Sequence, residues 1–271
     1  MIFCKELNKE FETRELMFAA LKANKDKIIG LKKANYKHSD PVSYVIKGDD
    51  VTKAADNTSV GVGSIIYACI NTTNWLDSHG DVHLNGIWDN SIKDQKGKLY
   101  YIINHDLKLG SVIAYPGDVE AYVQDLNWSD LGMDYQGTTQ ALMFKAKLTE
   151  ATNKDAFNAI ATKQDIQNSV RMGYISMTLC IDDKSPDFAQ ENANFYKYLP
   201  IIANKQDAID QGYFWAISEA KIVKEGSAVL FGSNEATPIL YSDPADAGQK
   251  DQLIPAGEQD SLINKNYLHF I

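Results

Sequence analysis

The sequence predicts a mainly β protein with flanking helices, whose core is an antiparallel, closed or nearly closed β-barrel. From Val60 onward, strand-like apolar runs follow one another, with turn-forming residues about every ten positions. Only one strong helical pattern interrupts these runs, and many strands with few helices favour a barrel over a doubly wound parallel sheet. At 271 residues, 44% of them hydrophobic, the chain is long enough to bury a large core.

Residues 1–40 are predicted to form a basic amphipathic helix. They carry nine Lys or Arg against six Asp or Glu, and apolar residues recur at helical spacing. The apolar stripe consists of Met17, Leu21, Ile28 and Leu31. Residues 41–59, rich in Asp, Ser and Lys, are interpreted as a linker. Residues 241–271, rich in Pro, Gly and Asp, are interpreted as a flexible acidic tail.

The core domain is expected to span residues 60–240. Its one strong helix is predicted over residues 153–170, packed outside the barrel. Asn153 is a suitable N-cap, and apolar residues follow it at helical spacing. These apolar residues are Phe157, Ile160 and Ile166.

Composition argues against several classes of function. The net charge of -9 makes a nucleic-acid partner a poor expectation, because most of the surface would repel phosphates. The three cysteines are widely spaced without a CxxC motif, so neither a disulfide framework nor a metal site is expected. No apolar run has the length of a membrane span, and the N-terminus has no signal-peptide pattern, so we expect a soluble protein in a cytoplasm-like compartment.

Two polar residues on predicted strands could carry chemistry. His105 ends the run "YYIINH", where alternation places it on one face with Tyr101 and Ile103. Ser176 lies in "VRMGYISMTL", on the strand expected after the strong helix. A serine hydroxyl is a weak nucleophile until a base removes its proton, so a histidine close to a serine on a rigid strand is the arrangement that acyl transfer needs.

The order of four sequence blocks resembles the prohead maturation proteases of tailed bacteriophages, whose fold is similar to that of the herpesvirus protease assemblin. The blocks are "DSHGDVHLNGIWDNSI", "IINHDLKLGSVI", "MGYISMTL" and "KEGSAVLFGSNEATPI". The block with His105 is similar to the family's catalytic-histidine block, and the block with Ser176 is similar to its nucleophile block. The resemblance covers roughly residues 60–240. It implies a β-barrel of the herpesvirus protease type and a serine endopeptidase with a Ser/His/acid triad.

Carried over to this chain, the resemblance makes Ser176 the nucleophile, His105 its general base and Glu225 the third residue. Asp106 is the next candidate for the third role, followed by Asp81. The third residue would hold the imidazole in the correct tautomer and stabilise its charged form.

Arg171 is a candidate for stabilising the oxyanion, although an arginine that ends a helix has a simpler role beside the helix dipole. The chain departs from the family at Thr178, where a glycine is common, and at "FGSN", residues 231–234, which replaces Phe-Pro-Ala-Asn. An alternative function is therefore a catalytically inactive relative that acts as a structural or scaffolding component of the phage capsid. An unrelated β-rich tail or adhesion protein is the other alternative.

The resemblance also implies the partners. The substrates would be the phage major capsid protein, the scaffold and the protease itself, inside the assembling procapsid in the host cytoplasm. Self-association fits such a setting. No cofactor, metal, nucleic acid or membrane is expected to take part.

Overall fold

The computed structural model of the chain describes residues 1–36, 59–241 and 243. The predicted linker, residues 41–59, lies outside the described residues apart from its last position. The predicted tail, residues 241–271, also lies outside them apart from Tyr241 and Asp243. No helix in the described part of the chain combines the length and apolar character that crossing a membrane requires.

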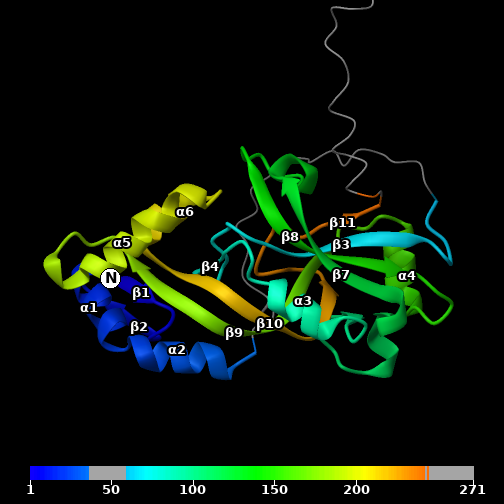
Figure 1. Ribbon diagram of the computed structural model, residues 1–271, viewed down its shortest axis with the longest axis horizontal. Coiled ribbons are helices and arrows are strands. Elements are labelled where there is room, and N and C mark those ends of the chain that lie inside the picture. The colour runs from blue at the N-terminus through cyan, green and yellow to red at the C-terminus, as the bar shows by residue number, and fades with distance from the viewer. Residues whose placement is uncertain (37–58, 242, 244–271) are drawn as a thin grey trace, which may run out of the picture.

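Two larger sheets and one hairpin make up the described β structure (Figure 1). The first sheet has the order β4 (Asp81–His83), β10 (Tyr213–Val229), β5 (Tyr100–Ile103) and β6 (Val112–Ala114), and β9 (Gln167–Ile181) also pairs with β10. The second sheet has the order β11 (Ile239–Leu240), β3 (Ile65–Thr72), β8 (Thr138–Lys147) and β7 (Val119–Asn127). The hairpin consists of β1 (Ile2–Cys4) and β2 (Lys9–Phe11).

The predicted antiparallel β-barrel is wrong, because the chain has mixed α and β structure with open sheets. Strand β10 pairs in parallel with both β4 and β5, and antiparallel only with β9. A barrel requires the last strand to form hydrogen bonds with the first, whereas the two larger sheets here end in separate edges. Alternation along a strand identifies its two faces, but it does not determine which strands pair or whether a sheet closes.

The helices also differ from the prediction. They are α1 (Arg14–Ala23), α2 (Lys25–Ala34), α3 (Asp89–Gln95), α4 (Lys154–Ala161), α5 (Ala189–Tyr198) and α6 (Lys205–Gln211). The helix expected over residues 153–170 begins as predicted, because the Asn153 side chain accepts hydrogen bonds from the backbone of Asp155 and Ala156. It ends at Ala161, and β9 already begins at Gln167.

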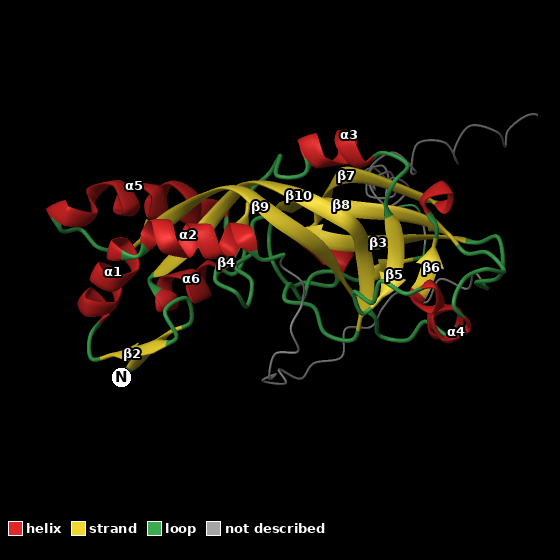
Figure 2. Ribbon diagram, turned by 90° about the horizontal axis from the view of Figure 1, so that it is seen from below, coloured by secondary structure: helices red, strands yellow, loops and turns green. Residues whose placement is uncertain are grey.

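The longest strands, β9 and β10, run through the middle of an elongated molecule (Figure 2). Helices α1, α2, α5 and α6 lie at one end of these strands, and the second sheet and α4 lie at the other end. A single hydrophobic cluster extends between the two ends, from Leu21 of α1 through Trp215 of β10 to Ile160 of α4. The strand pair therefore connects the two halves of the core.

Residues 1–36 form the hairpin and two helices in place of the single predicted helix. Asn24 ends α1 and precedes α2, and its side chain donates a hydrogen bond to the carbonyl of Ala20. The N-terminal segment is part of the main core, because Met17, Phe18 and Leu21 are buried in the same cluster as the strands. Glu6 accepts hydrogen bonds from Tyr213 and Trp215 of β10.

Candidate active site

His105 lies in a tight turn just beyond β5 and not on the strand itself. Strand β5 ends at Ile103, and Asn104 and His105 both have left-handed backbone angles, with φ of 51° and 55°. The backbone N–H of His105 donates to the Ser227 hydroxyl at 3.0 Å. Two successive non-glycine residues in this conformation carry a backbone cost, which such turns at functional sites commonly show.

The His105 imidazole is held by Glu225. Its Nδ1 lies 2.8 Å from Glu225 Oε1, and the two side chains are 8% and 0% exposed. The second carboxylate oxygen, Oε2, accepts the Ser227 hydroxyl at 2.8 Å. A buried carboxylate is costly without hydrogen bonds, and here both oxygens have partners. Because Nδ1 donates to Glu225, Nε2 carries the lone pair and can act as a base.

A β-bulge positions Glu225. Ile222 of β10 lies opposite Met172, and Gly226 lies opposite Val170, so three residues of β10 face one residue of β9. Within this bulge Lys224 has a positive φ of 69°. The bulge bends β10 and changes the direction of its side chains locally. The parallel pairing of Glu225 with Tyr100 places β5, and the His105 turn that follows it, next to this part of β10.

The other two candidates for the third residue do not contact His105. Asp106 accepts a hydrogen bond from Ser111 and lies 3.2 Å from Lys108, with its side chain 39% exposed. Asp81 lies at the other end of β10, opposite Trp215, where it binds Lys32 and the Tyr174 hydroxyl. The geometry therefore supports Glu225.

The structure does not bring Ser176 to this pair. Ser176 lies opposite Glu219, whereas Val170 lies opposite Gly226, the residue after Glu225. Ser176 is six positions after Val170, which corresponds to about 20 Å along a strand. The side chain of Ser176 is exposed on a distant part of β9.

The strand register places Ser169 across from the residue that joins His105 and Glu225. Ser169 lies directly opposite Ser227 on β10, and paired residues of antiparallel strands point to the same face with Cβ atoms about 5 Å apart. Ser227 contacts both Glu225 and the His105 backbone on that face. Ser169 is 7% exposed, and its neighbour Val170 points into the core on the opposite face.

Sequence reasoning missed Ser169 because it placed this residue at the end of the predicted helix. The stretch "NSVRMGY" alternates polar or small residues with Val170, Met172 and Tyr174, all of which are buried. That alternation is the signal for a strand beginning before Ser169. It also places Arg171 within β9, so Arg171 is not a helix-ending residue.

The remaining nucleophile candidates are less suited to attack a substrate. Ser227 is fully buried, and its hydroxyl already donates to Glu225 and accepts from His105. Burial raises the pKa of the Cys69 thiol, and raises that of Cys180 to about 12, so neither cysteine is a ready thiolate. Among the described residues, no group of three or more His, Cys, Asp and Glu side chains is arranged to hold a metal ion.

Comparisons of the chain with protein-family models, curated proteins and solved structures found no match. The chemical interpretation of the site therefore depends on its own geometry. A carboxylate and a serine on one face of adjacent strands, with an imidazole from the turn after β5, form the set of groups that nucleophilic acyl transfer uses.

Proposed function

We propose that this chain is a serine endopeptidase in which Ser169 is the nucleophile, His105 the general base and Glu225 the orienting carboxylate. One observation carries the proposal: the buried contact of 2.8 Å between His105 Nδ1 and Glu225 Oε1 lies on the strand face that Ser169 shares with Ser227. This assignment keeps the two predicted residues that the structure brings together and replaces Ser176.

In the proposed reaction, the proton of the Ser169 hydroxyl passes to His105 Nε2 as Oγ bonds to the carbonyl carbon of the substrate. The peptide C–N bond then breaks, and the same proton passes from Nε2 to the leaving amine. Water, activated by His105, hydrolyses the acyl-enzyme and regenerates the serine. Glu225 stabilises the imidazolium that forms in each half-reaction, and Ser227 positions both Glu225 and the His105 backbone.

The substrates that this proposal implies are proteins of an assembling phage capsid. Four blocks of the chain resemble prohead maturation proteases, and the histidine and glutamate of two of these blocks lie in contact. We therefore propose that the chain cleaves the major capsid protein, the scaffold and itself, inside the procapsid in the host cytoplasm. The open sheets differ from the barrel of that family, so the proposal depends on the site and not on the fold.

A structural role in the capsid is the second candidate, and one observation favours it. Glu225 and Ser227 are fully buried and bonded to each other, so their network also stabilises the junction of β5 and β10 without any catalysis. An inactive scaffolding component would keep this network and would have no reactive serine.

Labelling with a fluorophosphonate probe separates the two candidates. An activated serine Oγ bonds to phosphorus and displaces fluoride, and mass spectrometry then identifies the labelled residue. We expect the label on Ser169, and we expect Ser169→Ala to abolish labelling and self-cleavage, with turnover falling about a millionfold if the serine protease precedent holds.

The matched control is Ser176→Ala, which should label and cleave at the wild-type rate. Melting temperatures should be similar for all three proteins, because each change removes one hydroxyl. A label on Ser176 would contradict the assignment. A folded wild-type protein that neither reacts with the probe nor cleaves the capsid proteins would favour the structural candidate.

A further inference from the structure

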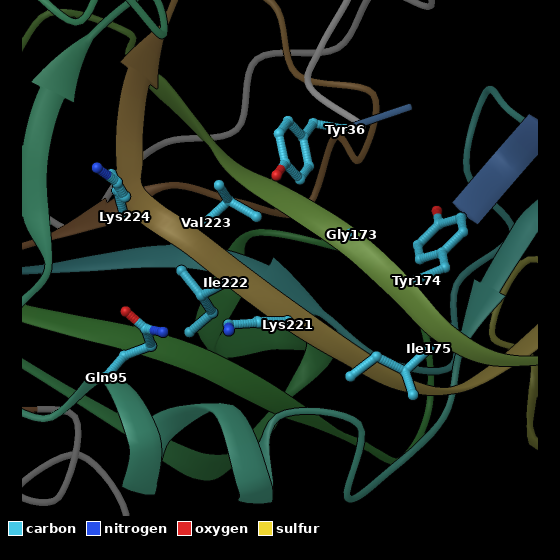
Figure 3. A pocket seen from close by; sticks show the side chains of 9 residues that line it. All are labelled: Tyr36, Gln95, Gly173, Tyr174, Ile175, Lys221, Ile222, Val223 and Lys224. Atoms are coloured by element: carbon cyan, nitrogen blue, oxygen red, sulfur yellow. The ribbon is translucent and has the colours of Figure 1, made fainter. Parts of the chain in front are cut away.

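A cavity of about 420 Å³ lies across the β9–β10 strand pair (Figure 3). Gly173 of β9 and Lys221 of β10 lie opposite each other in register and line it. Tyr36, which follows α2, and Gln95, the last residue of α3, lie on opposite sides of the two strands. Tyr36 packs over Gly173, since a Cβ atom at that glycine would lie 3.6 Å from the tyrosine ring. We call this site the lysine cavity.

The lysine cavity is on the same face of the strand pair as Ser169. Alternation along β9 places Ser169, Arg171 and Gly173 on one face, whereas Val170 and Met172 point into the core. The two register pairs, Ser169 with Ser227 and Gly173 with Lys221, extend that face onto β10. Gly173 is four positions after Ser169, or about 13 Å along the strand.

Positive charge is concentrated in the cavity and between the cavity and Ser169. Lys221 and Lys224 line the cavity, and the Arg171 guanidinium lies 5.4 Å from the centre of the Tyr36 ring. In the part of the chain that the structure describes, none of these three cations forms an ion pair, and the buried Nε of Arg171 has no hydrogen-bond partner. Glu219, the nearest acidic residue on β10 toward its N-terminal end, accepts a hydrogen bond from Asn90.

We propose that the lysine cavity binds an acidic side chain of the substrate polypeptide, about four residues from the scissile bond. This inference rests on the proposed function, because the distance from the scissile bond to the cavity is counted from Ser169 as the nucleophile. An extended substrate rises about 3.3 Å per residue, so a chain that passes Ser169 reaches Gly173 after about four residues. The two lysines would bind the carboxylate, and the ring of Tyr36 and the methyl groups of Val223 would contact the apolar stem of a glutamate.

The cavity holds a local group of cations on a protein of negative net charge, so an acidic peptide should bind at the cavity in preference to the rest of the surface. At -9 the surface as a whole repels an acidic peptide, so binding requires a local group of cations. The cavity supplies such a group, and the attraction should weaken at high salt because exposed charges are screened. A neutral peptide of the same length has no such attraction.

A binding experiment tests the inference without requiring cleavage. The probe is a fluorescein-labelled peptide of alternating Glu and Val, compared by anisotropy with its counterpart in which Gln replaces every Glu. The acceptor is the full chain carrying Ser169→Ala. We expect the acidic peptide to bind about tenfold more tightly than the Gln peptide at low salt, as two exposed ion pairs would give.

The double variant Lys221→Gln/Lys224→Gln should remove this difference. The matched control is Lys147→Gln/Lys154→Gln, which removes two exposed lysines from β8 and α4 and should retain it. Equal binding of both peptides, or full selectivity in the Lys221/Lys224 variant, overturns the inference. Selective binding together with failed probe labelling would reject the proposed protease and leave the acidic-peptide site standing.

Discussion

Glu225 gives the candidate site its geometry because its two carboxylate oxygens serve different partners. One oxygen accepts from the His105 ring, and the other accepts from the Ser227 hydroxyl, whose oxygen in turn accepts the His105 backbone N–H. Glu225 and Ser227 therefore hold His105 at both its ring and its backbone. Because Glu225 is fully buried, water cannot replace a lost contact.

We expect Glu225→Gln to reduce fluorophosphonate labelling and self-cleavage by orders of magnitude. The amide keeps the size of the side chain, but its NH₂ group would face a donor, either His105 Nδ1–H or the Ser227 hydroxyl. The ring then loses its fixed tautomer, and the equivalent change in a trypsin-type protease costs about ten thousandfold. Time courses of probe labelling and of precursor loss on gels would measure the effect.

Asp106→Asn is the control for this prediction, because Asp106 is partly exposed and binds only Ser111 and Lys108 among the described residues. It should label at nearly the wild-type rate, as should Asp81→Asn once its folding is verified. Severe loss in Asp106→Asn with normal labelling in Glu225→Gln would show that another carboxylate orients His105.

At the scale of elements, the β9–β10 strand pair passes through the site and packs against the second sheet. Gly226 lies between Glu225 and Ser227, and its Cα faces Phe144 of β8 and Ile70 of β3. A Cβ atom at this position would lie 2.8 Å from the Phe144 ring and 3.1 Å from Ile70. The absence of a side chain therefore allows the second sheet to approach the strand that carries Glu225.

Gly226→Ala is expected to destabilise the protein by about 1 to 3 kcal/mol, the usual cost of adding a methyl group to a packed core. Urea unfolding monitored by tryptophan fluorescence would measure it. Gly30→Ala in α2 is the matched control, because a Cβ there meets nothing within 4 Å, and alanine favours a helix. Equal stability of the two variants would mean that the sheets have room at Gly226.

At the scale of the whole molecule, buried charges dock the N-terminal segment onto the strands. Lys32 of α2 binds Asp81 of β4, and both side chains are buried. The Tyr174 hydroxyl donates to Asp81 at 2.8 Å, and burial next to this carboxylate raises the pKa of Tyr174 well above its ordinary value. Lys32 also lies 3.9 Å from Glu6, which binds β10. One cation therefore links the N-terminal segment to two strands of the first sheet.

Lys32→Met should lower the free energy of unfolding by about 3 to 5 kcal/mol, because it leaves Asp81 buried without its cation. Thermal and urea unfolding of the full chain would measure the loss. Lys33→Met removes an exposed lysine from the same helix and should have almost no effect. A similarly small effect of Lys32→Met would contradict a stabilising role for the buried Lys32–Asp81 pair.

The sequence by itself determined the features that depend on neighbouring residues along the chain. Alternation located most strands, the Asn153 cap located the start of α4, and the end of an apolar run pointed to His105, whereas Glu225 was indicated by the resemblance of its sequence block. These signals are local because side-chain periodicity and capping hydrogen bonds involve residues only a few positions apart.

Tertiary structure alone decided the pairing and register of the strands. Parallel pairing of β10 with β5, the bulge before Gly226 and the open edges of the sheets arise from contacts between distant segments. Register also decided that Ser169 and not Ser176 lies opposite Ser227, which contacts both His105 and Glu225. Alternation gives a residue its face, but its position along the partner strand depends on long-range packing and on bulges, which no local pattern records.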